Sequence, residues 1–201
     1  MRKPEVCILP VAGLSTRNLP ATKALHKGFL TLHSLPIIQY AVNACAEIGI
    51  KEVVFIYSDQ SCKHLFESYF SPYPWLENHL REKNKLDLLK AVQEVIPAGM
   101  KFSFAEQAEP KGNGHAILMA KDIVGDRDFI VMWPDDVYIN LHGDGVLKQL
   151  LDVYEKEGER RKKVIQYRHI LPVEKMFTWT DCHHFLKGHY ILTVSYTHLT
   201  L

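Results

Sequence analysis

Short apolar runs alternate along this chain with segments of helical periodicity, and this alternation restricts the fold more than any other feature. The runs Val6–Val11, Val53–Tyr57 and Phe129–Trp133 contain no charged residue, as expected of strands that are covered on both faces of a sheet. Phe102 and Phe104 alternate with polar neighbours, which predicts a further, half-exposed strand.

Four segments between or after these strands have apolar residues on one helical face. One begins at Pro36 and ends at Gly49, and two others are centred on Ala116–Val124 and Leu147–Tyr154. The fourth follows Pro72 and Pro74, and its expected buried positions are Leu76, Leu80, Leu86, Leu89 and Val92. Strict alternation of strand and helix predicts an α/β fold with a mostly parallel, mixed sheet and helices on both faces.

Composition excludes several classes of protein. With 201 residues, 47% of them hydrophobic and 23% charged, the chain is large enough for one globular domain. Its net charge of +1 argues against a nucleic-acid-binding protein, and its first apolar run is too short for a signal peptide or a membrane span. The four cysteines are widely spaced, without a C-x-x-C pair. We expect a reduced, cytoplasmic protein with no nucleic-acid or membrane partner.

The loop after the first strand has the features of a phosphate site. Gly13 and its small neighbours allow backbone N–H groups to approach an anion, and Arg17 and Lys27 can neutralise phosphate oxygens. The loop matches neither the Walker pattern nor G-x-G-x-x-G, which also argues against a dinucleotide-dependent oxidoreductase. An ordinary strand-to-helix turn with solvated basic residues is the alternative.

Two further segments with polar residues follow predicted strands. Asp135 and Asp136 come after the strand at Phe129–Trp133, and one of the two carboxylates suits Mg²⁺ beside a triphosphate; a helix cap is the alternative. Gln107 can donate to and accept from a pyrimidine edge, and Gly112 precedes a helix; a glycine-rich turn is the alternative here. Because parallel sheets bind ligands beyond the carboxyl ends of their strands, we expect all three segments to meet at one crevice.

Over about residues 5–158 the chain resembles the bacterial UTP–glucose-1-phosphate uridylyltransferases, also called UDP-glucose pyrophosphorylases. The matching motifs are Val11–Lys27 (VAGLSTRNLPATKALHK), Ile37–Tyr40, the insert at Leu76–Leu89, Lys111–Ala116 (KGNGHA) and the Pro134–Asp136 tripeptide. The resemblance implies a Rossmann-like nucleotidyltransferase fold. It also implies a reaction in which glucose 1-phosphate attacks the α-phosphorus of UTP in line, with Mg²⁺ as cofactor, and a homo-oligomer in the full-length form.

The resemblance further implies a role for each matching residue. Uracil would be held by backbone at Ala12 and Gly13, together with Gln107 and Gly112. Arg17 would neutralise the β- and γ-phosphates, Lys27 would bridge the α-phosphate and the sugar phosphate, and Asp135 would bind Mg²⁺. His115 would line the sugar side, or simply pack at the start of its helix.

Several positions depart from the family pattern. Ser15 replaces a second glycine, His26 replaces a proline, and Gly28 replaces an acidic residue; Thr31 and Asn113 are further replacements. We therefore expect the loop to be less preorganised than in the family. Two alternatives stay open: a nucleotide-binding or interaction module without turnover, and a thymidylyl- or mannose-type nucleotidyltransferase.

Residues 159–201 do not follow the family pattern. We interpret 1–158 as the nucleotide-binding part of the domain, and 159–201 as a divergent tail, from a truncated record that is frameshifted or artefactual after Gly158. Metal ligation by Cys182, His183, His184 and His189 is disfavoured, because their spacing matches no known site. The family's later half carries sugar-binding residues and a second metal aspartate, so we expect the chain to bind a nucleotide with little or no turnover.

Overall fold

The fold is a layered α/β structure built on a six-stranded sheet. The computed structural model describes residues 3–137, 143–157, 165–166 and 190–192. The strand order is β5-β4-β1-β6-β8-β7, and every pairing in this sheet is parallel. The strands are β1 (Val6–Pro10), β4 (Glu52–Tyr57), β5 (Lys101–Glu106), β6 (Phe129–Val131), β7 (Ile165–Gln166) and β8 (Tyr190–Leu192). The α/β fold and the four strands expected from the sequence are confirmed.

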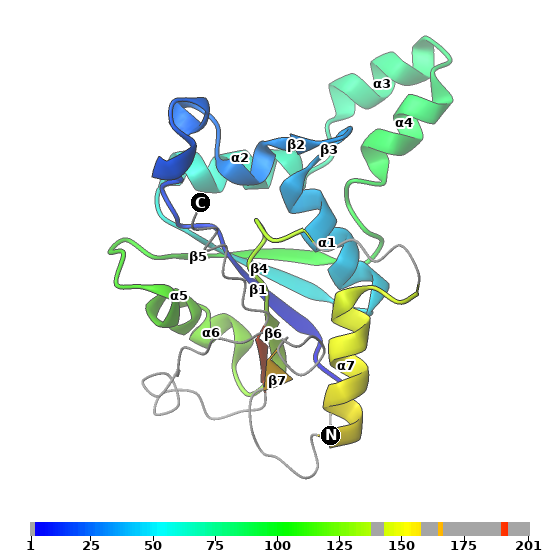
Figure 1. Ribbon diagram of the computed structural model, residues 1–201. Helices are drawn as coiled ribbons and strands as arrows, with labels where there is room; N and C mark the ends of the chain where they lie inside the picture. The colour runs from blue at the N-terminus through cyan, green and yellow to red at the C-terminus, as the bar shows by residue number, and fades with distance from the viewer. Residues whose placement is uncertain (1–2, 138–142, 158–164, 167–189, 193–201) are drawn as a thin grey trace.

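Helices cover both faces of the sheet (Figure 1). On one face, Leu9 and Phe55 pack in a core with residues of α1 (Ile37–Glu47), α2 (Gln60–Tyr69) and α7 (Val146–Glu157). On the other face, Ile8 and Ile56 pack against α5 (Asn113–Met119) and α6 (Lys121–Val124). Successive residues of one strand therefore enter two cores, which explains why these strands are continuously apolar in sequence.

Helix α2 was not predicted from the sequence. Asp59 caps it, since its Oδ1 accepts hydrogen bonds from the backbone N–H groups of Ser61 (2.9 Å) and Cys62 (3.0 Å). Phe66 anchors the helix in the core, where it is fully buried. The segment that the sequence assigns to one helix at Ala116–Val124 is divided by Ala120 into α5 and α6.

Helices α3 (Pro74–Glu82) and α4 (Leu86–Gln93) form a hairpin that projects from the body of the molecule (Figure 1). Leu80 and Leu89 are buried as expected, but Leu86 is 56% exposed, so its predicted burial is wrong. Leu86 is the first residue of α4, on an arm where each helix has mainly the other to pack against. The apolar period alone could not show that the arm stands away from the core.

The sequence predictions for the end of the chain are not tested by the fold. The expected boundary near residue 158 and the histidine-rich region with Cys182, His183, His184 and His189 lie outside the described residues. The described cysteines Cys7, Cys45 and Cys62 are buried free thiols. Within the described ranges, no helix has the length and apolar character needed to cross a membrane.

Candidate nucleotide site

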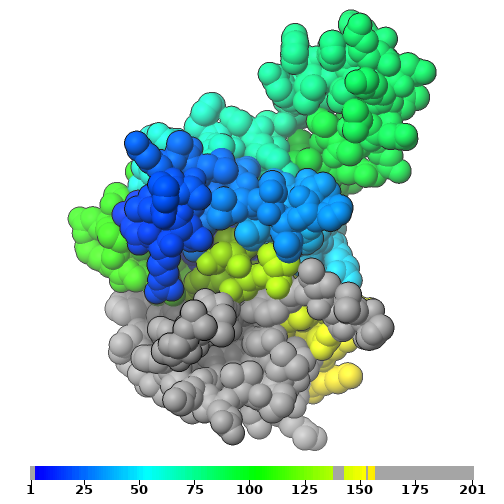
Figure 2. Space-filling model, turned by 45° about the horizontal axis from the view of Figure 1, so that its top comes forward, coloured from blue at the N-terminus to red at the C-terminus, as the bar shows by residue number. Residues whose placement is uncertain are grey.

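Loops at the carboxyl ends of β1, β4 and β5 lie next to one another. The carbonyl groups of Ile56 and Tyr57, at the end of β4, accept hydrogen bonds from the N–H groups of Val11 and Gln107, each at 2.8 Å. The opening loop (residues 12–29) and the Gln107 loop therefore start on either side of one strand end. Figure 2 shows the blue opening loop between the green region of α5 and the yellow-green segment that follows β6.

Lys27 and Asp135 meet across this edge although 108 positions separate them. Lys27 Nζ donates to Asp135 Oδ2 at 2.7 Å, and the two side chains are 26% and 40% exposed. Lys27 begins η3 (Lys27–Phe29), and Asp135 follows the end of β6. The structure thus joins the opening loop to the acidic segment, as the sequence predicted.

His26 caps the short helix η3, which begins at Lys27. Its Nδ1 accepts a hydrogen bond from the Gly28 N–H at 3.0 Å, and its ring packs edge-on against Phe66 at 5.1 Å between centroids. A Cβ atom at position 28 would lie 3.2 Å from His26 Nδ1, so the small Gly28 makes room for the ring. The two departures at positions 26 and 28 are in contact and accommodate each other.

His26 is held mainly in its neutral form. Burial lowers its pKa below 6.5, the nearby Lys27 lowers it further, and the Val11 carbonyl, Asp135 and Asp59 act in the opposite direction. Its Nε2 is buried without a hydrogen-bond partner among the described residues.

Ser15 adopts a left-handed backbone conformation, with φ 54° and ψ 32°. This conformation favours glycine, which is the residue that the family pattern has here. The Ser15 Oγ donates to the Gly13 carbonyl at 3.2 Å, and Thr22 Oγ1 donates to the Ser15 carbonyl at 2.9 Å. The loop keeps the turn with a less suitable residue.

Gln107, Gly112 and His115 form a compact group at the base end of the expected site. The Gln107 side chain is almost buried, and its Nε2 lies 3.1 Å from both the Gly112 carbonyl oxygen and His115 Nδ1. Gly112 has φ +93° and precedes the first residue of α5. His115 contacts Gln107, the residue expected to bind the base, and its place on the sugar side stays a prediction.

The other expected site residues lie on the opening loop. Ala12 and Gly13 follow β1 after Val11, and a Cβ atom at Gly13 would meet nothing within 4 Å. Arg17 is exposed in η1 (Thr16–Asn18), and no other described residue forms a hydrogen bond or ion pair with it. Lys23 is exposed in η2 (Ala21–Lys23). Strands β2 (Thr31–Leu32) and β3 (Leu35–Pro36) form a two-stranded antiparallel sheet between the opening loop and α1.

A cavity of about 500 Å³ separates the opening loop from the start of α2. Gly13, Lys23, His26 and Asp59 are among the residues that line it. The charged pair of Lys27 and Asp135 lies outside this lining, so the cavity does not by itself define the phosphate position.

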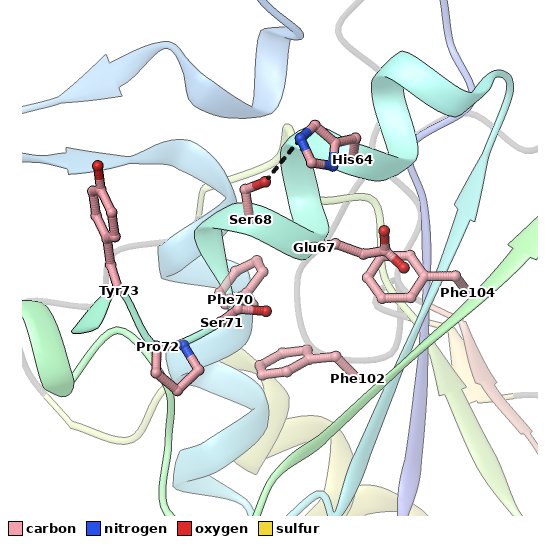
Figure 3. A pocket seen from close by; sticks show the side chains of 9 residues that line it. All are labelled: His64, Glu67, Ser68, Phe70, Ser71, Pro72, Tyr73, Phe102 and Phe104. Atoms are coloured by element: carbon pink, nitrogen blue, oxygen red, sulfur yellow. Dashed lines mark hydrogen bonds between the residues drawn. The ribbon is translucent and has the colours of Figure 1, made fainter. Parts of the chain in front are cut away.

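A larger groove of about 840 Å³ lies between α2 and the edge strand β5 (Figure 3). Phe70, Phe102 and Phe104 form its apolar wall, and His64 and Ser68, 3.5 Å apart, stand at its rim. No lysine, arginine or expected site residue lines it. Without a cation the groove is unsuited to a triphosphate.

Asp135 is the candidate protein ligand for a divalent metal at the site. Within the described ranges, no group of three or more histidine, cysteine, aspartate or glutamate side chains is arranged to hold a metal ion. Asp135 offers a partly exposed carboxylate beside Lys27 of the opening loop. This arrangement fits Mg²⁺, which binds through one or two carboxylates together with substrate phosphates and water.

Comparison with known proteins agrees with this geometry. Residues 6–170 match the nucleotidyl transferase family. UTP–glucose-1-phosphate uridylyltransferases are similar to the chain: that of Haemophilus ducreyi is 44% identical over 76% of the chain and 51% of its own length, and that of Pseudomonas aeruginosa is 36% identical over 84% and 58%.

Solved structures give the same relationship. The UTP-bound UGPase of Acinetobacter baumannii superposes with a TM-score of 0.72 at 34% identity, over 77% of this chain and 54% of that one. A UDP-glucose pyrophosphorylase in complex with UDP-glucose has a TM-score of 0.64 at 33% identity, over 77% and 55%. The chain spans about half the length of the relatives that it matches. From the family match and the arrangement of the loops, we conclude that the chain belongs to the nucleotidyl transferase family.

Proposed function

We propose that this chain is the nucleotide-binding part of an enzyme that forms UDP-glucose and pyrophosphate from UTP and glucose 1-phosphate. The observation that carries the proposal is the contact of Lys27 with Asp135 at the edge where the Gln107 loop also begins. A nucleoside triphosphate with a divalent metal requires a cation beside the phosphates, a carboxylate for the metal and polar groups for the base. The similarity to uridylyltransferases favours UTP among the nucleotides.

The chain's residues would act by positioning and charge neutralisation. Gln107 and Gly112, with backbone of Ala12 and Gly13, orient the base. Arg17 neutralises the β- and γ-phosphates, and Lys27 neutralises the α-phosphate and the incoming sugar phosphate. An oxygen of the sugar phosphate then attacks the α-phosphorus, and pyrophosphate leaves on the opposite side. No side-chain nucleophile is needed for such a step.

Asp135 would hold Mg²⁺ together with phosphate oxygens. The metal, when bound, would neutralise charge on the phosphates. In the described structure Lys27 Nζ contacts the carboxylate at Oδ2, so a metal would share this carboxylate with Lys27 or displace it. Lys27 lies close enough to Asp135 to neutralise phosphate oxygens beside the metal.

A second candidate is a module that binds a nucleotide without turnover. The left-handed backbone of Ser15, at a position where the family pattern has glycine, favours it. The cytoplasmic location, the homo-oligomer and the choice of glucose stay predictions.

Calorimetry with UTP, followed by a coupled pyrophosphate assay with Mg²⁺ and glucose 1-phosphate, tests both candidates on the chain of 201 residues. UTP binding by the chain supports both candidates, because only the nucleotide-binding part is present. Pyrophosphate release, by the chain or by a version that carries the family's later half, supports the enzyme, and UTP binding without release in that longer version supports the module. Lys27→Met should weaken UTP binding, while Lys90→Met, which removes a lysine from the exposed pair with Glu94 on α4, should not. Failure of the chain to bind any of UTP, dTTP or GTP would reject both candidates.

A further inference from the structure

The side-chain amide of Gln107 has a fixed orientation in this structure. Its Nε2 faces the Gly112 carbonyl oxygen at 3.1 Å, and a carbonyl oxygen can only accept. The –NH₂ group must therefore lie on that side, since the reverse orientation would bring two oxygens together. The Gly112 carbonyl accepts the Ala116 N–H at 3.1 Å with one lone pair and has a second for Gln107.

His115 takes the remaining amide hydrogen. Its Nδ1 lies 3.1 Å from Gln107 Nε2, so the neutral ring accepts there and carries its proton on Nε2. Gly112 and His115 are three positions apart at the start of α5, and the helix therefore presents both acceptors to the same amide. Both donors of Gln107 are thereby used.

The Oε1 atom of Gln107 is left to meet a ligand. It accepts no hydrogen bond from the described part of the chain, and it is not among the side-chain atoms that are buried from solvent without a partner. The residue as a whole is only 6% exposed, so little water could replace a base in a hydrogen bond to Oε1. A buried acceptor discriminates strongly between a base that donates to it and one that does not.

We propose that His115 is a positioning residue for base selection, which locks the Gln107 amide so that its oxygen faces the base. This inference rests on the proposed function. A fixed acceptor favours a pyrimidine with a hydrogen at N3, as in uracil and thymine. Cytosine presents a lone pair at N3 and would meet Oε1 with repulsion. The contact therefore separates UTP from CTP but does not separate UTP from dTTP.

Binding of UTP, CTP and dTTP to the chain of 201 residues, measured by calorimetry, tests this role. The wild type should prefer UTP and dTTP to CTP. His115→Ala removes one of two acceptors, so the ratio of UTP to CTP affinity should fall roughly fivefold, the effect of one hydrogen bond. The ratio of UTP to dTTP affinity should stay within about twofold. The Gly112 carbonyl still opposes the reversed amide, so selection weakens and does not vanish.

Two further variants separate positioning from a structural role. His115→Asn places an amide oxygen near the position of Nδ1 and should restore most of the preference for UTP over CTP. His79→Ala, at a ring stacked on Trp75 in the projecting arm, should change neither ratio. An unchanged ratio of UTP to CTP in His115→Ala, or an equal loss of affinity for all three nucleotides, overturns the proposal. Absence of UTP binding in the wild type instead rejects the proposed function, and this inference with it.

Discussion

At the scale of single residues, Lys27 and Asp135 neutralise each other where a triphosphate and a metal are expected. Each side chain therefore holds the other in place until a ligand separates them. Mg²⁺ at Asp135 would weaken the attraction between Asp135 and Lys27, and phosphate at Lys27 would do the same. Metal and nucleotide should for this reason bind cooperatively.

Asp135→Asn should change how UTP binding depends on Mg²⁺. Without metal, the variant should bind UTP about twofold to fivefold more tightly, because a partly exposed carboxylate no longer neutralises Lys27 or repels phosphate. With metal, the variant should gain little, whereas the wild type should gain strongly. Titration of UTP by calorimetry with and without Mg²⁺ measures both effects; Asp87→Asn, on α4, is the matched control. Equal metal dependence in wild type and variant would reject the assignment of Asp135.

Ser15→Gly should stabilise the protein. Glycine adopts φ 54° without the steric cost that serine bears, so the free energy of unfolding should rise by about 0.5–1 kcal/mol despite the lost Oγ bond to Gly13. Urea unfolding measures the change. Ser71→Gly, at an exposed residue without positive φ, should give no gain. A loss of stability in Ser15→Gly would show that the Ser15 hydroxyl matters more than the backbone conformation.

The sequence predicts which residues form the candidate site, and the structure adds the contacts between them. Arg17, Lys27, Gln107 and Asp135 could be chosen because each follows a strand end and carries the required chemistry. The contact of His115 with Gln107 depends on how the start of α5 faces the end of β5, which no spacing in the sequence reveals.

At the scale of elements, the opening loop is held by packing on α2. The sequence treats positions 26 and 28 as two separate departures, whereas the structure joins them through a hydrogen bond and a close approach. Helix α2 itself was missed, because its only strong signal is Asp59 as a cap and its apolar face is small. Phe66 shows the consequence, since it supports both the strand core and the His26 ring.

The buried His26 should make stability depend on pH. Its pKa is lowered in the folded protein by burial, so the unfolded chain binds the proton more readily. The stabilisation is fully present above the unfolded pKa of about 6.5 and is lost as pH falls from there through the lowered folded pKa. His26→Asn can keep an acceptor for the Gly28 N–H and does not titrate, so it should lose less stability than wild type between pH 7.5 and 5.5. Parallel urea unfolding curves for the two proteins at both values provide the measurement, and an equal loss in both would contradict the prediction.

At the scale of the whole molecule, the alternation of apolar runs and amphipathic helices was sufficient to predict a parallel α/β sheet. Apart from Glu52 at the start of β4, strands β1 and β4 are apolar because helices cover both faces, and this burial is visible in the sequence. The projecting arm was not predictable in the same way. Leu86 fits the apolar period of a helix but is exposed. The period shows which face of a helix is apolar, but it does not show whether another part of the molecule covers that face.

The amino ends of the strands, opposite the nucleotide site, are joined by ion pairs to the buried carboxylate of Glu52; its partners Lys101 and Arg127 are 70% and 40% exposed. The Glu52 side chain is 5% exposed and accepts hydrogen bonds from Lys101 and Arg127, each at 2.8 Å, and from Ser103 at 2.5 Å. Burial disfavours the charged carboxylate, but these three partners outweigh it and lower the pKa to about 2. The network ties β4 to β5 and to the turn before β6, so it acts on the whole sheet.

Removal of the Glu52 charge should therefore destabilise the entire fold. Glu52→Gln keeps the shape of the side chain but loses the charged hydrogen bonds, so the free energy of unfolding at pH 7 should fall by about 1–3 kcal/mol. The stabilisation from ionised Glu52 is present above the ordinary pKa of 4.5 and is lost as pH falls toward 2, so the difference between variant and wild type should narrow over that range. Urea unfolding at pH 7, 5 and 3 measures both the loss and its pH dependence. The control Glu94→Gln, in an exposed pair with Lys90, should lower the free energy of unfolding by no more than about 0.5 kcal/mol. A similar loss in the two variants would show that the ion pairs of Glu52 contribute no more than a surface ion pair.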